Sequence, residues 1–322
     1  MNVVVTGGAG FIGSHLCEAL LGLGHSVVAL DNFLTGTSDN VAHLRHRDAF
    51  TLIEADVTEP LPALAPDAIF HLASAASPEG YGRHPVETLM TNSLGTYHLL
   101  ELAHRQGARF LLASTSEVYG DPAVHPQPEG YWGNVNPIGP RACYDEGKRF
   151  AEALTINYVR VKQLDARIVR IFNTYGPRNH PQDGRVIPNF LAQAVLGEPL
   201  TVYGDGRQSR SFCYVSDLVE GLVRVMYHPG TAGEVFNLGN PEEYQVAVLA
   251  ERVKEIAGST SAIVHLPGRP EEIARRRPDI AKARAVLGWA PSVPLDEGLQ
   301  RTLAWFREAV GARSSASTPS AL

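Results

Sequence analysis

The 322-residue sequence predicts an α/β fold, in which helices cover both faces of a doubly wound parallel sheet, and three observations lead to it. Short β-branched runs alternate with longer amphipathic stretches throughout the first half of the chain. A glycine-rich turn joins the first run to the first amphipathic stretch, and beyond Thr174 the alternation gives way to recurrent Gly and Pro. Parallel strands need crossover helices between them, so this order indicates a buried parallel sheet followed by a smaller lobe.

Six apolar runs are expected to form the strands of this sheet: residues 3–5, 26–30, 51–53, 68–72, 110–113 and 166–171. Helices are expected at about residues 11–21, 85–105, 142–161, 186–196 and 216–228. Residues 121–140 are rich in proline, which removes backbone donors, and they are therefore expected to form a loop.

We expect three regions along the chain. Residues 1–174 are predicted to form the core, to which parts of the later chain return. Residues 175–311 are predicted to form mainly a smaller C-terminal substrate-binding lobe over the carboxyl ends of the strands, where open α/β sheets bind their ligands. Residues 312–322 are rich in Ser and Ala and are predicted to be a disordered tail.

Composition excludes several classes of function. The formal net charge of −6 gives no electrostatic basis for binding nucleic acid or an acidic membrane. The three cysteines, Cys17, Cys143 and Cys213, are too few and too scattered for a disulfide framework or a metal site, so no metal is expected. The chain opens with a strand-like segment instead of a signal sequence, and no apolar run approaches the ~20 residues that cross a bilayer. We therefore expect a cytoplasmic protein with neither nucleic-acid nor membrane partners.

The turn between the first predicted strand and the first helix carries Gly7, Gly10 and Gly13 in the pattern G-x-x-G-x-x-G. Glycines let the backbone approach a pyrophosphate that rests on the helix N-terminus. A tight strand–helix turn without a ligand is the alternative interpretation. The agreement of strand, helix and glycine spacing favours a Rossmann-type dinucleotide site.

Two carboxylates follow the next two predicted strands. Asp31 would accept hydrogen bonds from the ribose hydroxyls and would repel a 2′-phosphate, which favours NAD over NADP. An ordinary loop aspartate is the alternative for this residue. Asp56 and Val57 are placed to meet the adenine, but a helix cap explains Asp56 equally well.

A hydroxyl pair, Ser114 and Thr115, lies at the end of the fifth predicted strand, and Tyr144 and Lys148 follow on a predicted helix. Because Tyr144 and Lys148 are four residues apart, they share one helix face. A lysine beside a tyrosine lowers the pKa of the phenol, so Tyr144 would take a proton from an alcohol during hydride transfer. This spacing alone is more often a solvated helix face, but its place one strand–helix unit after the hydroxyl pair favours catalysis.

Six longer motifs make the chain recognisable. They are residues 112–122 (LASTSEVYGDP), 136–149 (NPIGPRACYDEGKR), 170–178 (RIFNTYGPR), 183–190 (DGRVIPNF), 199–206 (PLTVYGDG) and 277–280 (RPDI). From residue 1 to about 310 the chain resembles the extended short-chain dehydrogenase/reductase superfamily, and within it the UDP-glucuronate decarboxylases (UDP-xylose synthases). The resemblance implies NAD as cofactor, a UDP-sugar substrate, and a homodimer that pairs the helices around 85–105 and 142–161.

The same resemblance implies a mechanism. Tyr144 would take the proton from O4 of the sugar while hydride passes from C4 to NAD+, with Lys148 completing the redox machinery. Thr115 would hydrogen-bond the C4 oxygen. The resulting β-keto acid would lose CO2, and Glu117 would protonate the enolate carbon directly or through water. Return of the hydride would leave UDP-xylose.

Position 116 separates the relatives. The 4,6-dehydratases carry Asp-Glu where this chain has Ser116-Glu117, and an aspartate there would repel a substrate carboxylate. Sugar 4-epimerases generally lack the glutamate, whereas Ser116 is able to donate a hydrogen bond to that carboxylate. The Ser116-Glu117 pair therefore favours decarboxylation over the alternative of an ordinary loop pair. By the family pattern Arg276, one of three consecutive arginines, pairs with the carboxylate; a solvated basic loop is the alternative.

The resemblance also assigns ligand contacts. Arg210 is expected at the diphosphate, Tyr203 and Val186 at the uracil, and the expected substrate-binding residues together are Asn173, Val186, Tyr203, Arg210 and Arg276. Further cofactor contacts are expected from Phe11, Ile12, Asn32, Leu72 and Ala73, in addition to Tyr144 and Lys148.

One departure from the family concerns Met90, which stands where a lysine is common. Because that lysine is expected near the substrate, Met90 predicts altered sugar placement and easier escape of the 4-keto intermediate. Two alternative activities therefore stay open from the sequence, release of UDP-4-keto-xylose and 4-epimerisation of UDP-glucuronate. A non-catalytic NAD-binding protein is a third alternative, against which Thr115, Tyr144 and Lys148 argue.

Overall fold

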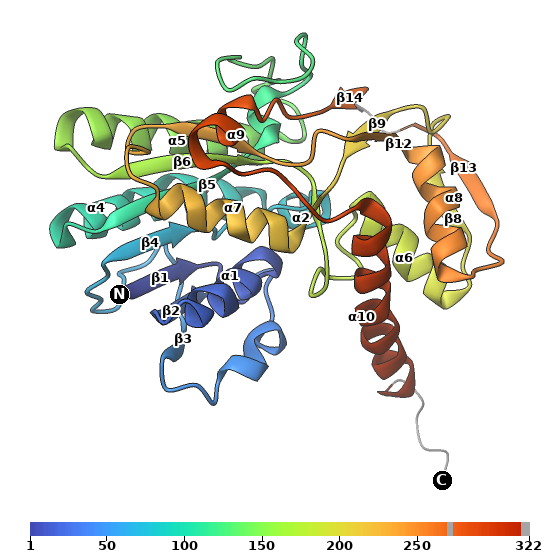
Figure 1. The fold of residues 1–322 in the computed structure, drawn as a ribbon, viewed down its shortest axis with the longest axis horizontal. Helices are drawn as coiled ribbons and strands as arrows, with labels where there is room; N and C mark the ends of the chain where they lie inside the picture. The colour runs from blue at the N-terminus through green and yellow to red at the C-terminus, as the bar shows by residue number, and fades with distance from the viewer. Residues whose placement is uncertain (269–272, 317–322) are drawn as a thin grey trace.

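The β-branched runs of the first half form a parallel sheet in the computed structural model, which describes residues 1–268 and 273–316 and the side chains of the last helix as far as residue 309 (Figure 1). Among the described residues this sheet has seven strands in the order β11-β6-β5-β4-β1-β2-β3. They are β1 (Asn2–Thr6), β2 (Ser26–Asp31), β3 (Phe50–Glu54), β4 (Ala68–His71), β5 (Arg109–Thr115), β6 (Ala166–Ile171) and β11 (Val235–Leu238). The strand order reverses beside β1, and such a reversal opens a crevice at the carboxyl ends of the strands.

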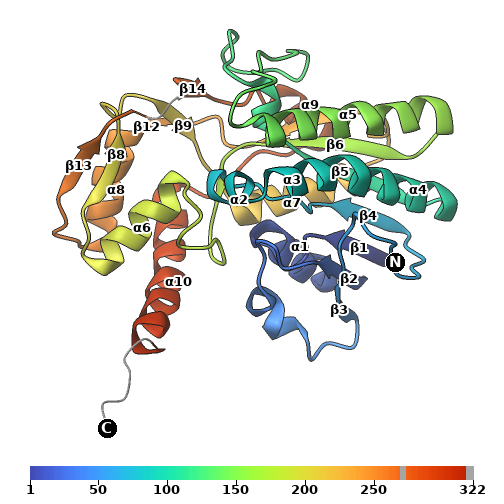
Figure 2. The same ribbon diagram turned by 180° about the vertical axis from the view of Figure 1, so that it is seen from behind.

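Helices cover the two faces of the sheet. On one face lie α1 (Phe11–Gly22) and α7 (Val215–Tyr227), whose apolar side chains share one buried cluster with β1 and β2 (Figure 1). On the other lie α4 (Thr96–Gln106) and α5 (Ala142–Lys162), as the view from behind shows (Figure 2). This burial on both faces explains why the strand sequences are almost continuously apolar.

Short elements join the core to the edge of the crevice. The 3₁₀ turn η1 (Ser38–Leu44) follows β2, and α2 (Pro78–Arg83), α3 (Pro85–Met90) and the π turn η2 (Thr91–Gly95) lead into α4. The 3₁₀ turn η3 (Ser116–Tyr119) follows β5 directly. Because η3 starts where β5 ends, its side chains lie at the carboxyl edge of the sheet.

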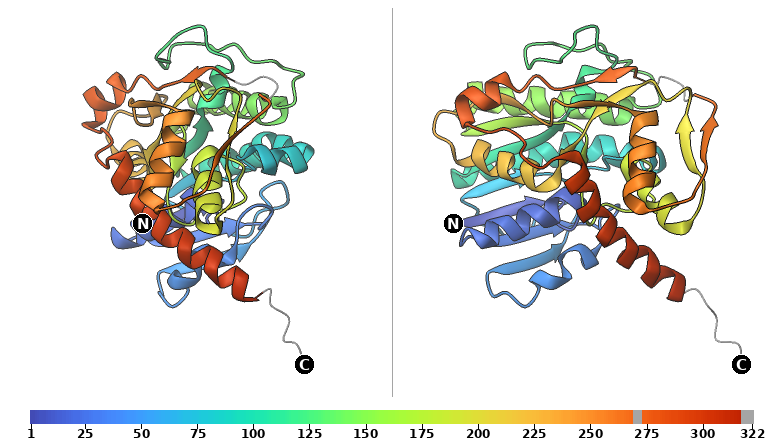
Figure 3. Two further views of the ribbon diagram at one scale, coloured as in Figure 1. Left: turned by 90° about the vertical axis from the view of Figure 1, so that its right-hand side faces the viewer. Right: turned by 45° about the vertical axis from the view of Figure 1, so that its right-hand side comes forward.

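A smaller lobe lies beside the carboxyl edge of the sheet (Figure 3). Its helices are α6 (Val186–Leu196), α8 (Val246–Ala257) and α10 (Leu295–Ala316). Strand β8 (Leu200–Tyr203) pairs with β13 (Ile263–Leu266), and β9 (Ser209–Ser211) lies between β12 (Glu243–Gln245) and β14 (Arg275–Arg276). The chain crosses between core and lobe at β7 (Thr174–Tyr175), which pairs with β10 (Cys213–Tyr214), and returns to the core with α7, β11 and α9 (Ala281–Leu287).

The predicted fold class is confirmed, with three local corrections. The sheet has a seventh strand, β11, because its buried residues Phe236 and Leu238 pair with β6. The helix expected over residues 85–105 is interrupted by the π turn η2, whose Asn92 side chain bonds back to the carbonyl of Thr88. Residues 312–316, expected to belong to a disordered tail, continue α10 to Ala316; residues 317–322 lie outside the described residues.

The helices of residues 1–268 and 273–316 include none with the length and apolar character that a bilayer span requires. Within the same residues no three His, Cys, Asp or Glu side chains gather closely enough to hold a metal ion.

Candidate active site

A cavity of about 1380 Å³ opens between the carboxyl edge of the sheet and the small lobe. This volume exceeds the 300–1,000 Å³ typical of one small-molecule site, so it has room for a dinucleotide and a second ligand. The predicted site residues that line it are Gly7, Gly10, Phe11, Ile12, Gly13, Asp31, Asn32, Val57, Leu72, Ala73, Thr115, Ser116, Glu117, Tyr144, Lys148, Asn173, Val186, Tyr203, Arg210 and Arg276. Asp56 is the predicted site residue that does not line it.

The turn between β1 and α1 forms the dinucleotide end of the cavity. A Cβ at Gly13 would lie 2.0 Å from the carbonyl oxygen of Gly7, so helix and turn are close enough only for glycine. Gly7 itself has φ +70° and approaches the backbone of Ala73. Gly10 caps α1 without a side chain, which leaves the first-turn N–H groups for a ligand anion.

Asp31 at the end of β2 completes this end of the cavity. Its Oδ2 accepts from the Ala9 N–H at 2.9 Å and its Oδ1 from the Phe33 N–H at 2.9 Å, which fixes the carboxylate at the cavity wall. Burial raises the pKa of Asp31, and these two hydrogen bonds oppose the rise. A glycine cradle, an open helix N-terminus and an acidic side chain beyond the second strand fit a dinucleotide with free ribose hydroxyls.

Asp56 lies outside the cavity and supports its dinucleotide end. Its Oδ2 accepts from the Asn32 Nδ2 at 2.8 Å, and its Oδ1 accepts from the N–H and hydroxyl of Thr58. No helix starts in this described segment, so the helix-cap interpretation of Asp56 is wrong and the residue stabilises a turn. The neighbouring Val57 reaches the cavity.

Tyr144 and Lys148 share the cavity-facing side of α5, as their spacing predicts. Burial raises the pKa of Tyr144 to about 12, and a hydrogen bond with Thr115 opposes the rise. The Lys148 Nζ donates to the Ala113 carbonyl at 2.9 Å and lies 6.0 Å from the centre of the Tyr144 ring. The lowering of the Tyr144 pKa by Lys148 stays a prediction, since burial has the largest effect on the phenol here and the Lys148 amine donates to Ala113.

The two hydroxyl groups at the end of β5 have different hydrogen-bond partners. Ser114 donates to Glu152 Oε1 at 2.6 Å, and Glu152 also forms an ion pair with Arg170 at 2.8 Å. Thr115 is the hydroxyl that meets Tyr144. Burial lowers the pKa of Lys148 to about 7, and the negative charge of Glu152 opposes this.

Glu117 lies between two arginines on η3. Its Oε1 pairs with Arg276 Nη1 on β14, and its Oε2 pairs with Arg141 Nη2 just before α5. Burial alone would raise the pKa of Glu117, but Arg276 and Arg141 outweigh it and hold the pKa well below its usual range. The two guanidiniums therefore favour the ionised form of Glu117.

The structure separates the three consecutive arginines. Arg276 is 3% exposed, lines the cavity and also donates to the Gly120 carbonyl at 2.8 Å. Arg275 points to solvent and pairs with Glu243 at 3.0 Å. The backbone N–H of Arg277 donates to Gln127 outside the cavity.

Sequence reasoning missed four charged residues in or beside the site. Arg141 holds Glu117 and lies 3.9 Å, Nε to Oδ2, from Asp145, which is buried in the first turn of α5. Arg185 donates to the Ala76 carbonyl and pairs with Asp183 at 3.4 Å. The i,i+3 spacing of Arg141 and Tyr144 was a usable signal, because it places both at one helix entrance.

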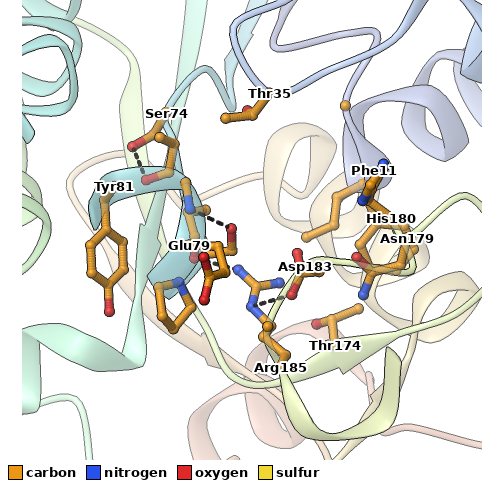
Figure 4. A pocket seen from close by; sticks show the side chains of 18 of the residues that line it. Phe11, Thr35, Ser74, Glu79, Tyr81, Thr174, Asn179, His180, Asp183 and Arg185 are labelled. Carbon is orange, nitrogen blue, oxygen red and sulfur yellow. Dashed lines mark hydrogen bonds and ion pairs between the residues drawn. The ribbon is translucent and has the colours of Figure 1, made fainter. Parts of the chain in front are cut away.

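Figure 4 shows the substrate side of the cavity, where the Arg185 side chain is directed toward Asp183, between Glu79 on α2 and Thr174 on β7. Tyr81, which forms part of the opposite wall in this view, stacks on Tyr144 with ring centres 5.3 Å apart and planes 11° apart.

Met90 stands apart from this wall. It ends α3, is 41% exposed and does not line the cavity, whereas the adjacent Thr91 does. The departure from the family at this position therefore changes the outer surface of α3 and not the wall of the cavity.

Comparison with known proteins gives consistent results. Residues 3–239 match the NAD dependent epimerase/dehydratase family. The chain is 53% identical over 307 residues to UDP-glucuronic acid decarboxylase 1 of Xenopus tropicalis, covering 95% of this chain and 72% of that protein. It is 53% identical over 310 residues to UDP-glucuronic acid decarboxylase 1 of Arabidopsis thaliana, covering 96% and 71%.

Solved structures resemble the whole fold. UDP-glucuronic acid 4-epimerase from Bacillus cereus, in complex with UDP-glucuronic acid and NAD, has a TM-score of 0.86 and 29% identity, covering 96% of this chain and all of that one. A dTDP-glucose 4,6-dehydratase from Streptomyces venezuelae with NAD bound has a TM-score of 0.86 and 30% identity, covering 97% and 98%.

Proposed function

The chain belongs to the NAD dependent epimerase/dehydratase family, and we propose that its activity is the NAD-dependent decarboxylation of UDP-glucuronate to UDP-xylose. One observation carries the assignment within the family: a buried arginine, Arg276, meets Glu117 beside the Thr115–Tyr144 pair. A guanidinium at this position would pair with the carboxylate of a sugar acid. A neutral sugar has no charged group for it to pair with.

The dinucleotide end holds NAD. The glycine turn and the α1 N-terminus take the pyrophosphate, and Asp31 takes the ribose hydroxyls. A bound NAD would supply the hydride acceptor and donor for C4 of the sugar, without net consumption of the cofactor.

Tyr144 and Thr115 form the base at O4. Thr115 already bonds Tyr144, so a sugar hydroxyl placed between them would have an acceptor and an orienting donor. The Tyr144 phenol is protonated in the ligand-free chain, and a protonated Lys148 brought closer to it would favour the phenolate. On the return step the same phenol gives the proton back to O4.

Ser116, Glu117 and Arg276 act at the carboxylate end of the sugar. Oxidation at C4 makes the sugar a β-keto acid, whose C5–C6 bond breaks as its electron pair enters the enolate. Arg276 orients the carboxylate that leaves as CO2, with Ser116 as a further donor. Glu117 delivers a proton to C5 directly or through one water.

The remaining contacts belong to the nucleotide. Asn173 follows β6, Arg210 lies on β9 and both line the cavity, and we assign both to the diphosphate. Val186 at the start of α6 and Tyr203 at the end of β8 lie in the small lobe, where we place the uracil.

We also propose a cytoplasmic homodimer. Apolar side chains lie exposed on neighbouring helices: Val86, Leu89 and Met90 on α3, Tyr97 on α4 and Phe150 on α5. A second copy that covered this face would bury them. The three free thiols fit a reducing compartment. Light scattering of the purified protein tests the dimer, and a monomer at micromolar concentration would contradict it.

Product analysis tests the activity. Purified protein is incubated with UDP-glucuronate and NAD+, and nucleotide sugars are followed by mass spectrometry with chromatographic separation. We expect a mass loss equal to CO2 and co-elution with UDP-xylose. A product two hydrogens lighter would indicate release of UDP-4-keto-xylose, and an isomer of unchanged mass would indicate 4-epimerisation. Absence of the CO2 loss would contradict the proposal.

A further inference from the structure

Four charged side chains form a continuous row beside the cavity, in the order Asp145, Arg141, Glu117, Arg276. Arg141 lies between two carboxylates, with Nη2 on Glu117 and Nε 3.9 Å from Asp145 Oδ2. Glu117 in turn lies between two guanidiniums. With both carboxyl groups ionised the row carries two negative and two positive charges, but burial and Glu117 raise the pKa of Asp145 to about 7, so Asp145 is ready to take up a proton near neutral pH.

The row is buried at its two ends, partly buried at Arg141 and Glu117, and incompletely satisfied in its hydrogen bonds. Asp145 and Arg276 are 6% and 3% exposed. Among the described residues, the buried atoms without a hydrogen-bond partner include Asp145 Oδ1, Arg141 Nε and Arg276 Nε. Because water reaches these groups poorly, a change of one charge within the row is expected to be compensated by a proton.

Other charged and titratable groups around the row do not alter this count. Arg185 from the opposite wall is paired with Asp183, and Glu146 is partly exposed on α5 and pairs with Arg149. The further groups that act on Glu117 or Asp145 are the neutral phenols Tyr81 and Tyr144 and the guanidinium Arg210, which we assign to the diphosphate.

Substrate binding adds a third carboxylate, and this step rests on the proposed function. Arg276 still has its unpaired Nε–H for the substrate carboxylate, so it would share its single positive charge between that carboxylate and Glu117. Three carboxylates then share two guanidiniums. Like charges this close in a buried site do not all stay ionised, so one carboxyl group takes up a proton.

The reaction itself requires one proton from solution. When a carboxylate leaves as CO2, the C5–C6 bond breaks, its electron pair stays with the sugar, and C5 must bond a proton. The proton that Tyr144 removes from O4 does not supply it, because that proton returns to O4 when the ketone is reduced. One H+ is therefore consumed for each CO2 released.

We propose that Asp145 is a positioning residue: it competes for Arg141 when the substrate carboxylate takes Arg276, so that Glu117 binds one proton from solution and delivers it to C5. Substrate binding thereby supplies Glu117 with the proton that decarboxylation consumes. In the ligand-free chain, burial and then the charge of Glu117 raise the pKa of Asp145, whereas Arg276 and Arg141 hold that of Glu117 low. The two carboxylates thus already compete for one guanidinium.

Proton uptake on binding tests the proposal. The Tyr144→Phe protein is loaded with NAD+ so that ligands bind without turnover, and calorimetric titrations are run in two buffers of different ionisation enthalpy. Near pH 7.5 we expect UDP-glucuronate to take up about one proton more than UDP-glucose. Adding Asp145→Asn should reduce this difference by at least half, because Arg141 then stays on Glu117.

Glu146→Gln is the matched control, since it removes the same charge from the neighbouring position of α5 at a partly exposed side chain. It should leave the uptake unchanged. Equal proton numbers for the two sugars, or equal losses caused by Asp145→Asn and by Glu146→Gln, would overturn the proposal.

The pH profile of turnover separates positioning from a merely structural role. With Asp145→Asn alone, the alkaline limb of kcat should move to lower pH by about one unit, so activity recovers as pH falls. Asp145→Glu should restore the wild-type limb. A loss of the same size at every pH would contradict the proposal. Failure of the wild-type chain to release CO2 would instead contradict the proposed function, while the binding titration would still report on the charged row.

Discussion

At the dinucleotide end of the cavity the backbone forms the site, whereas at the sugar end charged side chains form it. Gly7, Gly13 and the N-terminus of α1 create the first by leaving room and exposing N–H groups. Glu117 and Arg276, from η3 and β14, create the second by pairing across a sequence separation of more than 150 residues. A site formed by the backbone should lose its ligand when a larger side chain changes its shape. A site formed by charged side chains should lose its activity when one of the charges is removed.

Removing one charge from the sugar end should have the largest effect. With Glu117→Gln we expect kcat to fall by roughly 10³-fold, since general acid catalysis contributes about 10²–10⁴-fold. Affinity for NAD+, measured by titration, should change less than twofold because the dinucleotide end is untouched. A parallel loss of NAD+ affinity would mean that the two ends are not separable.

Changing shape at the dinucleotide end should come next. A methyl group at Gly13 would lie 2.0 Å from the Gly7 carbonyl oxygen, so Gly13→Ala should weaken NAD+ binding at least tenfold and lower the free energy of unfolding by about 3 kcal/mol. Denaturant titration and cofactor titration measure the two effects.

Gly22→Ala is the control in the same helix, because nothing lies within 4 Å of its Cβ position. It should be neutral or stabilising by up to about 1 kcal/mol. If both alanines behaved alike, the glycine cradle would not be the feature that forms the site.

Lys148 lies between the two ends, and its burial should be visible in stability. Burial lowers its pKa to about 7 in the folded chain, whereas the unfolded chain holds the proton up to about pH 10.5. The unfolded state thus binds more protons between these values, and folding stability contributed by this group rises with pH across that window.

Replacement by Lys148→Met removes the buried amine. In nucleotide-free protein we expect the variant to be more stable than wild type by up to about 4 kcal/mol at pH 6.5, and this advantage should fall below about 1 kcal/mol by pH 10. Urea unfolding at several pH values measures it. A difference that does not depend on pH would show that Lys148 is already charged in the fold.

Asp56 should have the smallest effect, because it supports the dinucleotide end from outside the cavity. Asp56→Ala removes acceptors for Asn32 and Thr58 and should lower the free energy of unfolding by about 1 kcal/mol, with NAD+ affinity reduced less than threefold. Asp31→Ala, at the cavity wall, should weaken NAD+ binding more than tenfold. Equal losses from both variants would place Asp56 in direct contact with the ligand.

The sequence predicted the dinucleotide end well because its determinants are local. The glycine spacing, the strand before it and Asp31 all fall within the first βαβ unit, where spacing alone limits the geometry. β11 was missed because its four residues become a strand only by pairing with β6, about 65 residues earlier in the chain.

The sugar end was predicted only in part, for the same reason. Glu117, Tyr144 and Arg276 were found through motifs, but the pairing of Glu117 with Arg141, and the burial of Asp145 beside it, are tertiary contacts. For Tyr144, helix spacing gives the proximity of Lys148 but not the hydrogen bond that holds the Lys148 amine at Ala113.

Strand β11 is made long after its partner β6, and this has a consequence for biosynthesis. Until residue 238 has left the ribosome, the outer edge of β6 has no partner strand, and an open edge of a parallel sheet invites pairing with another chain. A truncated chain ending near residue 174 would keep that edge permanently exposed and should aggregate. Anyone who wishes to excise the nucleotide half as a stand-alone reagent must therefore continue the chain through Leu238, so that β11 pairs with the edge of β6.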